Sequence, residues 1–345
     1  MYDRLADLSL VVDDYDLTGA SLDVSSDFTR VTTTVTLSGD GATGVGEDVG
    51  YEADDQRRFQ QAYGDGSLTL AGTYTLDSFS DRLDDLALFP EPPNRTADGH
   101  YRRWAFESAA LDLALRQAET NLGERLDREY DPVEFVVSTR LETPARLDEI
   151  RTVHPNAEFK LDPTDEWDDA LVAAIAERGG VRVLDLKAHY EGTDVDLSPD
   201  VALYRRVTNA FPNAIIEDPG ITDETRPLVE EIRDRVSWDA PITSVDAIEA
   251  LPFEPRWLNI KPSRFGTVES LFDVIEYCEA RRIRMYGGGQ FELGVGRGQI
   301  QTLASLCYAD SPNDVAPSRY NKLDLDADLP TSPLEPPVDP AGFRW

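Results

Sequence analysis

Basic charge is what this sequence has least of. Its 345 residues include 33 Lys and Arg against 66 Asp and Glu, so the formal charge is −33. We expect no nucleic-acid partner, because no basic stripe is available to neutralise phosphates. The hydrophobic content of 41%, arranged in regular runs, indicates a folded chain. An acid-rich composition is typical of halophilic proteins, whose self-repulsion is screened by a high-salt cytoplasm.

Lysine is scarcer still, with only four among the 33 basic residues. Lys160, Lys187 and Lys261 end segments that are typical of core β-strands, whereas Lys322 lies in a polar C-terminal segment. A desolvated lysine can shift its pKa and act as a base, whereas arginine stays protonated. The three lysines are therefore candidates for proton transfer. The alternative is that they are structural ion-pair partners.

Cysteine and long apolar runs are also rare. Cys278 and Cys307 lie in apolar helical contexts, which predicts free thiols in a reducing compartment. No run approaches the length of about 18 apolar residues that a membrane helix needs. No charged segment followed by an apolar one opens the chain. We therefore expect a soluble, cytoplasmic protein with no membrane partner.

Signatures of two common enzyme classes are missing. No G-x-S-x-G segment is present, which argues against a serine-hydrolase elbow. The glycine-rich segment 287–296 has no GK[ST] after it and so does not form a P-loop. Among the histidines, His189 follows a predicted strand end and is either a substrate contact or structural.

From residue 133 onward, short β-branched runs alternate with amphipathic stretches. This alternation predicts a parallel α/β barrel or a doubly wound sheet, and the count and spacing favour the barrel. We expect strands over 133–139, 157–161, 181–187, 213–218, 241–246, 256–261 and 283–288.

The first 130 residues have a different pattern. Residues 29–39 alternate like a half-exposed antiparallel strand, 8–17 form another candidate strand, and 103–126 predict a long helix. We expect an α+β domain over 1–130 and a barrel domain over 131–319. The Pro- and Asp-rich residues 320–345 are expected to pack over the surface.

Charged residues gather at the predicted strand ends, where barrel enzymes place their active sites. Carboxylates on three consecutive strands suit Mg²⁺, which prefers oxygen ligands and leaves positions for a substrate. Lysines beside them can then reach a carbon that the metal has acidified. In so acidic a chain, chance placement is the alternative for any one carboxylate. The strand-end residues are Lys160, Asp185, Lys187, Glu217, Asp218, Asp246 and Lys261, with Gln290 and Glu292 just beyond the last strand.

Six segments, in this order and spacing, resemble the enolase superfamily in its muconate-lactonizing and o-succinylbenzoate-synthase branch, part of the mandelate racemase/muconate lactonizing enzyme family. The resemblance spans nearly the whole chain. The segments are GVGEDVGYE (44–52), FESAALDLAL (106–115), AIIEDP (214–219), LNIKPSRFG (258–266), YGGGQFELGVGRGQIQTLAS (286–305) and PNDVAPSRYN (312–321).

The resemblance implies a capping α+β domain over a modified (β/α)₇β barrel. It also implies abstraction of the proton α to a carboxylate by a lysine, with Mg²⁺ stabilising the enediolate. The outcome, whether racemisation or epimerisation, dehydration or cycloisomerisation, stays open. A homo-oligomer is common in this fold. The implied residues are the metal ligands Asp185, Glu217 and Asp246, the acid/base pair Lys160 and Lys261, and the substrate contacts Lys187, Gln290, Glu292 and Tyr51.

The chain departs from the family pattern at three strand ends. Glu158 replaces the first lysine of the usual K-x-K and should raise the pKa of Lys160. Lys187 stands where Asn is usual. Of the D-E-S that usually ends the fifth strand, only the acid at the second position is present, as Asp246. A cation beside a metal site weakens metal binding unless it pairs with Glu158, Asp218 or the substrate. We expect Lys187 to replace the missing lysine; the alternative is a non-catalytic barrel that binds a ligand or partner without turnover.

Overall fold

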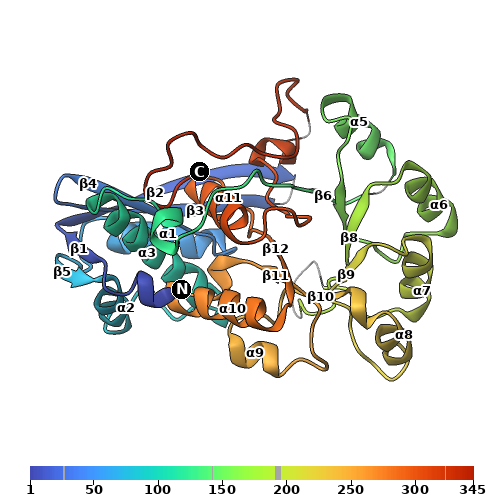
Figure 1. Ribbon diagram of the computed structural model, residues 1–345, viewed down its shortest axis with the longest axis horizontal. Coiled ribbons are helices and arrows are strands. Elements are labelled where there is room, and N and C mark those ends of the chain that lie inside the picture. The colour runs from blue at the N-terminus through green and yellow to red at the C-terminus, as the bar shows by residue number, and fades with distance from the viewer. Residues whose placement is uncertain (26–27, 142, 191–195, 323) are drawn as a thin grey trace.

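The N-terminal part of the chain is built on antiparallel strands (Figure 1). The computed structural model describes residues 1–25, 28–141, 143–190, 196–322 and 324–345. A three-stranded sheet has the order β2-β3-β4, and β1 pairs separately with β5. The expected strand over 29–39 is confirmed, and the one over 8–17 is divided between β1 and β2. The bounds are β1 Ser9–Val12, β2 Asp14–Ser25, β3 Phe28–Gly39, β4 Ala42–Asp48 and β5 Gly72–Thr75.

One long helix, α3 (Thr96–Gln117), packs against this sheet and is buried along most of its length. Two glycines of β4 permit the contact, because a Cβ on Gly44 or Gly46 would lie about 2 Å from a carbonyl oxygen of α3. The expected helix over 103–126 begins earlier and ends earlier, since Glu119 has a φ of 51°. The other helices of this part are η1 (Tyr2–Arg4), α1 (Ala53–Tyr63), α2 (Leu76–Asp84) and α4 (Leu122–Leu126).

The second half of the chain forms a seven-stranded sheet in which each strand lies parallel to its neighbours in sequence order (Figure 1). Six of the seven expected strands are confirmed. The strands are β6 Val137–Thr139, β7 Phe159–Leu161, β8 Val181–Asp185, β9 Ile215–Glu217, β10 Val236–Trp238, β11 Trp257–Ile260 and β12 Arg284–Gly287.

The strand expected over 241–246 is wrong. Its hydroxyl-bearing Ser244 instead caps helix α9 (Val245–Glu249) and accepts a hydrogen bond from the Ala247 N–H at 3.1 Å. The strand in this place is β10, a buried three-residue segment that pairs with β9 and β11.

Helices connect the strands and cover the outer face of the sheet (Figure 1). Several begin at a side-chain cap, such as Asp168 before α6 and Thr267 before α10. Helix α6 ends at two glycines, because Gly179 and Gly180 have φ values of 66° and 79°, which glycine adopts without strain. The helices are α5 Ala145–Val153, α6 Asp169–Arg178, α7 Val201–Ala210, α8 Arg226–Glu231, η2 Arg233–Arg235, η3 Pro262–Arg264, α10 Val268–Arg281, α11 Val295–Cys307 and η4 Ser318–Asn321.

Within the described residues the seven strands form an open sheet, so the expected (β/α)₇β barrel is seen only in part. A short segment touches both edges: Asn313 forms a parallel bridge to Phe135, which precedes β6, and Asp314 forms one to Gly288, which follows β12. The last residues pack on the N-terminal part, where Phe343 is buried beside Trp104. The domain boundaries at 130 and 319 stay a prediction.

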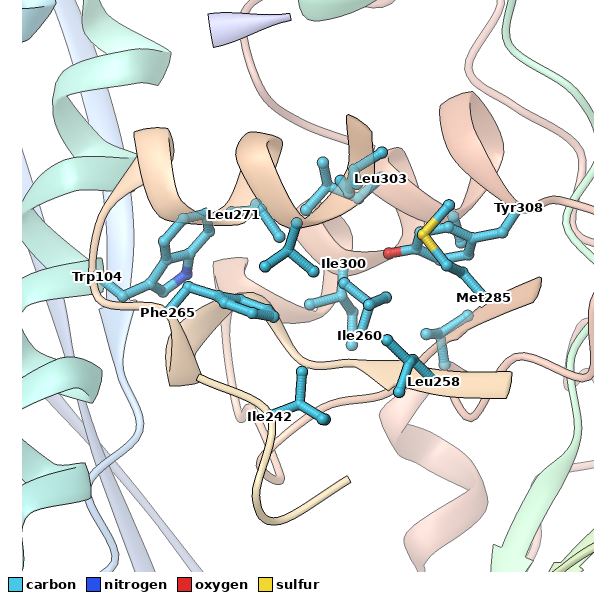
Figure 2. Close-up of a cluster of buried hydrophobic side chains, with 14 of the residues drawn as sticks. Trp104, Ile242, Leu258, Ile260, Phe265, Leu271, Met285, Ile300, Leu303 and Tyr308 are labelled. Atoms are coloured by element: carbon cyan, nitrogen blue, oxygen red, sulfur yellow. The ribbon is translucent and has the colours of Figure 1, made fainter. Parts of the chain in front are cut away.

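The main core lies between the sheet and its helices. Figure 2 shows Leu258 and Ile260 of β11 facing Leu271 of α10 and Leu303 of α11, with Trp104 of α3 at one side. Burial of each such side chain stabilises the fold by about 1.5–3 kcal/mol. Packing of α3 against this core holds the N-terminal part to the sheet. None of the described helices combines the length and apolar character that spanning a bilayer requires.

Candidate active site

Three buried carboxylates meet at the carboxyl ends of adjacent strands. Asp185 ends β8, Glu217 ends β9 and Asp239 directly follows β10. One oxygen of each lies within 4.8 Å of the others, and all three side chains are inaccessible to solvent. The third carboxylate expected here was Asp246, but this residue lies exposed in the first turn of α9. The misplaced strand caused the error, since the true strand end is Trp238.

Two lysines flank this row of carboxylates. Lys160 on β7 is 2% exposed, and its Nζ lies 2.6 Å from Glu217 Oε1 and 3.4 Å from Asp185 Oδ2. Lys261, which follows β11, places its Nζ 2.8 Å from Asp239 Oδ2. Because β8, β9 and β10 lie between β7 and β11, the two ammonium groups approach the carboxylates from different sides. The structure thus brings both predicted acid/base lysines to the cluster.

Glu217 is held by a network inside the sheet. Asn259 Nδ2 lies 3.3 Å from its Oε1, and the Tyr286 hydroxyl donates to Oε2 and is 3.0 Å from Ser237 Oγ. Burial raises the pKa of Glu217 to about 8, against the opposing effect of Lys160. Sequence reasoning missed Tyr286, and its only signal was a tyrosine within a core strand.

Asp239 is held by groups from three segments. Tyr190 donates from its hydroxyl at 2.7 Å and Arg264 from Nη2 at 3.2 Å, both to Oδ2. The backbone N–H groups of Asp239 and Ala240 donate to the two oxygens of Asp218 at 2.8 Å. Asp218 therefore positions the end of β10. Burial, with Asp239 nearby, raises the pKa of Asp218 to about 6.

Lys187 enters the site, but with partners that differ from those expected. Its Nζ contacts Asp185 Oδ2 and lies 3.5 Å from Asp162 Oδ1. Glu158 pairs instead with Arg182 and does not contact Lys160. Glu158 is therefore not the acid that raises the pKa of Lys160.

Burial lowers the pKa of Lys160, but the charges of Glu217, Asp185 and Asp314 outweigh it and raise this pKa well above its usual value. The same balance, with Asp162 and Asp185 as the acids, raises the pKa of Lys187. In the arrangement described, both lysines are therefore charged counter-ions of the carboxylates.

Tyr51, Gln290 and Glu292 join the N-terminal part to the loop after β12. The side-chain amide of Gln290 donates to the Tyr51 hydroxyl at 3.0 Å, and its oxygen accepts from Arg264 Nε at 2.8 Å. The backbone N–H of Gln290 donates to Glu292 Oε1 at 2.6 Å. Arg30 donates to four backbone carbonyls in the same two loops, and its guanidinium lies 4.5 Å from the centre of the Tyr51 ring. Gln290 contacts Arg264, which also binds Asp239, whereas Tyr51 and Glu292 lie beside the cluster. His189 stacks near Trp238, with Nε2 at 3.3 Å from the Pro219 carbonyl oxygen.

A further contact crosses from β4 to the sheet domain. The buried carboxylate of Glu47 accepts hydrogen bonds from the N–H groups of Leu293, Gly294 and Gly296 at 2.8 to 3.0 Å. These groups open helix α11, so Glu47 acts as its N-terminal anion. The two parts of the chain thereby fix the loop that carries Gln290.

A cavity of about 1050 Å³ opens at the same end of the sheet. It reaches from Ser138 and Arg140 at the end of β6, past Thr164, to Phe291 beside Gln290. In the register of β6 with β7, Ser138 pairs with Lys160. Ser138 is thus the lining residue that neighbours Lys160 across the strand pair, whereas Lys160 itself is buried and does not line the cavity.

The carboxylates fit a divalent cation. Oδ1 of Asp239 is buried and accepts no hydrogen bond from the described residues. Six carboxyl groups and four cationic side chains make up the network, so acidic groups outnumber basic ones around this oxygen. Its members are Asp162, Asp185, Glu217, Asp218, Asp239 and Asp314 with Lys160, Lys187, Lys261 and Arg264.

Family models match both parts of the chain. Residues 3–125 match the N-terminal domain, and residues 129–322 match the C-terminal domain, of a family described as a domain of unknown function (DUF8230). The chain belongs to the DUF8230 family.

This DUF8230 protein is similar to two curated enzymes. It is 26% identical over 247 residues to an o-succinylbenzoate synthase of Bacillus subtilis, covering 67% of the chain and 63% of that enzyme. It is 28% identical over 283 residues to an N-succinylamino acid racemase of an Amycolatopsis species, covering 77% and 74%. The chain thus spans less than two thirds of the first relative.

Solved structures show that the DUF8230 protein has the fold of the enolase superfamily. A member of that superfamily from Enterococcus faecalis aligns with a TM-score of 0.67 at 18% identity, covering 89% of this chain and 86% of the other. Muconate lactonizing enzyme from Pseudomonas putida aligns with a TM-score of 0.62 at 20% identity, covering 88% of each chain.

Proposed function

We propose that this protein is a Mg²⁺-dependent isomerase or lyase that removes the α-proton of a small carboxylate substrate. The observation that carries the proposal is the row of three buried carboxylates flanked by two buried lysines on five adjacent strands. The relatives named as a synthase and a racemase of succinyl compounds support this class of reaction.

Asp185, Glu217 and Asp239 would hold the metal. When bound, Mg²⁺ would neutralise the substrate carboxylate and so acidify the adjacent carbon–hydrogen bond. In the metal-free protein the carboxylates keep Lys160 protonated, and a cation bound to them would remove that stabilisation. Lys160 and Lys261 would then remove and return the proton from their different sides, a geometry that suits racemisation or epimerisation. Elimination needs only one of them, so dehydratase and cycloisomerase outcomes remain within the proposal.

The rest of the site would bind and enclose the substrate. The cavity beside Ser138 and Arg140 would take the part distant from the metal. Tyr51 and Gln290 would contact it from the capping side, with Glu292 holding the Gln290 loop in place. Burial around the lysines would exclude water from the reacting carbon.

The proposal includes the homo-oligomer that the sequence resemblance implies. It also includes a halophilic, cytoplasmic setting, which the chain's acidity supports. Activity assays should therefore run in molar salt, where self-repulsion of the −33 charge is screened.

Isotope exchange tests the function directly. Both enantiomers of a set of N-succinylamino acids are incubated with the enzyme and Mg²⁺ in deuterated high-salt buffer, and the mass gain at the α-carbon is followed. We expect exchange that depends on Mg²⁺. Lys160→Met should abolish exchange of one enantiomer and Lys261→Met that of the other.

Arg281→Met is the matched control, because this exposed residue lies at the end of α10 remote from the strand ends. It should exchange as the wild type does. Absence of exchange with a broad carboxylate set, together with no Mg²⁺-induced change in Tm, would favour the second candidate, a non-catalytic barrel. The replacement of the usual lysine by Glu158 favours that candidate.

A further inference from the structure

Lys187 shares one carboxylate oxygen with a second lysine. Oδ2 of Asp185 contacts Lys187 Nζ and lies 3.4 Å from Lys160 Nζ. The Lys187 ammonium therefore competes with a metal ion for this oxygen, and Lys160 adds a second positive charge beside it. The contact with Lys187 has to be released before Oδ2 of Asp185 can act as a ligand.

The two lysines differ in their freedom to move. Lys160 is 2% exposed, lies within β7 and has Glu217 at 2.6 Å. The Lys187 side chain is 18% exposed and follows the end of β8, with a backbone φ of 53° and its N–H 3.1 Å from Asp185 Oδ1. Lys187 is therefore the residue that can leave.

A second partner is already within reach. Asp162 Oδ1 lies 3.5 Å from Lys187 Nζ, is buried, and has no hydrogen-bond partner among the described residues. The Asp162 side chain is 21% exposed overall, so this pair borders the open part of the site. A small rotation of the Lys187 side chain would exchange one carboxylate for the other.

We propose that Lys187 is the internal counter-ion of the metal site, bound to Asp185 in the metal-free protein and transferred to Asp162 when a divalent cation binds. The inference rests on the proposed function, because it takes Asp185 as a metal ligand. Lys187 is then a positioning residue that sets the affinity for the cation and protects the metal-free fold from charge repulsion.

Binding of Mn²⁺ alone, measured by calorimetry in high-salt buffer at constant pH, tests this without any substrate. Removal of the competing charge in Lys187→Met should tighten Mn²⁺ binding by at least tenfold. Removal of the alternative partner in Asp162→Asn should weaken it by a similar factor. Lys187→Arg keeps the charge and should stay within a few-fold of the wild type, as should the control Arg281→Met.

Thermal unfolding without metal supplies the second measurement. Lys187→Met should lower the Tm of the metal-free protein, and Mn²⁺ should restore more than that loss. If Lys187→Met does not fold, the weakening expected for Asp162→Asn decides the question.

The outcomes separate the two proposals. Wild-type protein that binds Mn²⁺, together with a folded Lys187→Met variant of equal or weaker affinity, overturns the counter-ion role and leaves the function standing. No Mn²⁺ binding by either protein overturns the metal site and, with it, this inference. Binding by Lys187→Met alone supports the counter-ion role and overturns the metal-dependent function of the wild type.

Discussion

Asp98, buried at the start of α3, should contribute less to the stability of the fold at neutral pH than in mild acid. The side chain is 4% exposed, and its Oδ2 has no hydrogen-bond partner among the described residues. Burial raises its pKa from 3.8 to about 6, partly offset by Arg95 and reinforced by Asp48. A carboxyl whose pKa is raised on folding stabilises the fold below its unfolded pKa, and this contribution is lost as the pH rises through the folded pKa.

The size of the effect follows from the shift. Two pKa units correspond to ~3 kcal/mol, since one unit is about 1.4 kcal/mol. Replacement by Asn removes this cost but also removes a negative charge from the first turn of α3, which is worth about 0.5–1 kcal/mol. We therefore expect Asp98→Asn to be more stable than the wild type by about 2 kcal/mol at pH 7.5. The gain should vanish near pH 4.

Denaturant unfolding in high salt, followed by tryptophan fluorescence between pH 4 and 8, measures the difference between the two proteins at each pH. Taking the difference cancels the titration of other carboxylates. Asp246→Asn is the control, because Asp246 also lies in a first helical turn but is exposed. Its effect on the free energy of unfolding should be small. A stability difference for Asp98→Asn that does not change with pH would refute the reasoning.

Three further predictions concern residues around the site and the end of the chain. Tyr286→Phe removes a donor from buried Glu217 and should lower the free energy of unfolding by about 1–2 kcal/mol in denaturant titrations, whereas an unchanged value would show that the bond contributes nothing. Phe343→Ala should cost about 3 kcal/mol, because the ring is buried beside Trp104, and a loss below 1 kcal/mol would mean that the last residues pack loosely. Arg30→Met removes hydrogen bonds to four carbonyls of the loops that carry Tyr51 and Gln290, and should raise KM about tenfold with little change in kcat; a fall in kcat alone would contradict this.

Periodicity predicted the strands wherever a run was long and β-branched. Strand β10 was not predicted, because Val236–Trp238 has only three residues and a central serine, whereas the pattern of 241–246 is more typical of a strand. The local capping bond to Ser244 Oγ from the Ala247 N–H stabilises a helix start at this position. The same error hid Asp239, since the position of a strand end determines which acid reaches the cluster.

The candidate lysines were predictable because lysine is so rare in this chain. The ion-pair partners of these lysines were not predictable, because pairing depends on whether a side chain lies near the amino or the carboxyl end of its strand. Glu158 lies two residues before Lys160 in the sequence, yet it forms an ion pair with Arg182 and does not join the carboxylate cluster. Asp162 and Asp314 reach the lysines from loops whose paths periodicity does not describe.

The close approach of β4 to α3 has a consequence for how this chain can be divided. The family matches separate the chain between residues 125 and 129, which invites expression of the second half alone. Such a fragment would lack Glu47, leaving the first N–H groups of α11 without their anion, and would expose the core where Trp104 now packs (Figure 2). Chimeras that exchange capping domains between relatives would need to keep Gly44, Gly46 and Glu47 together. The two glycines allow β4 to lie close to α3, and this approach determines how near the Glu47 carboxylate lies to the start of α11.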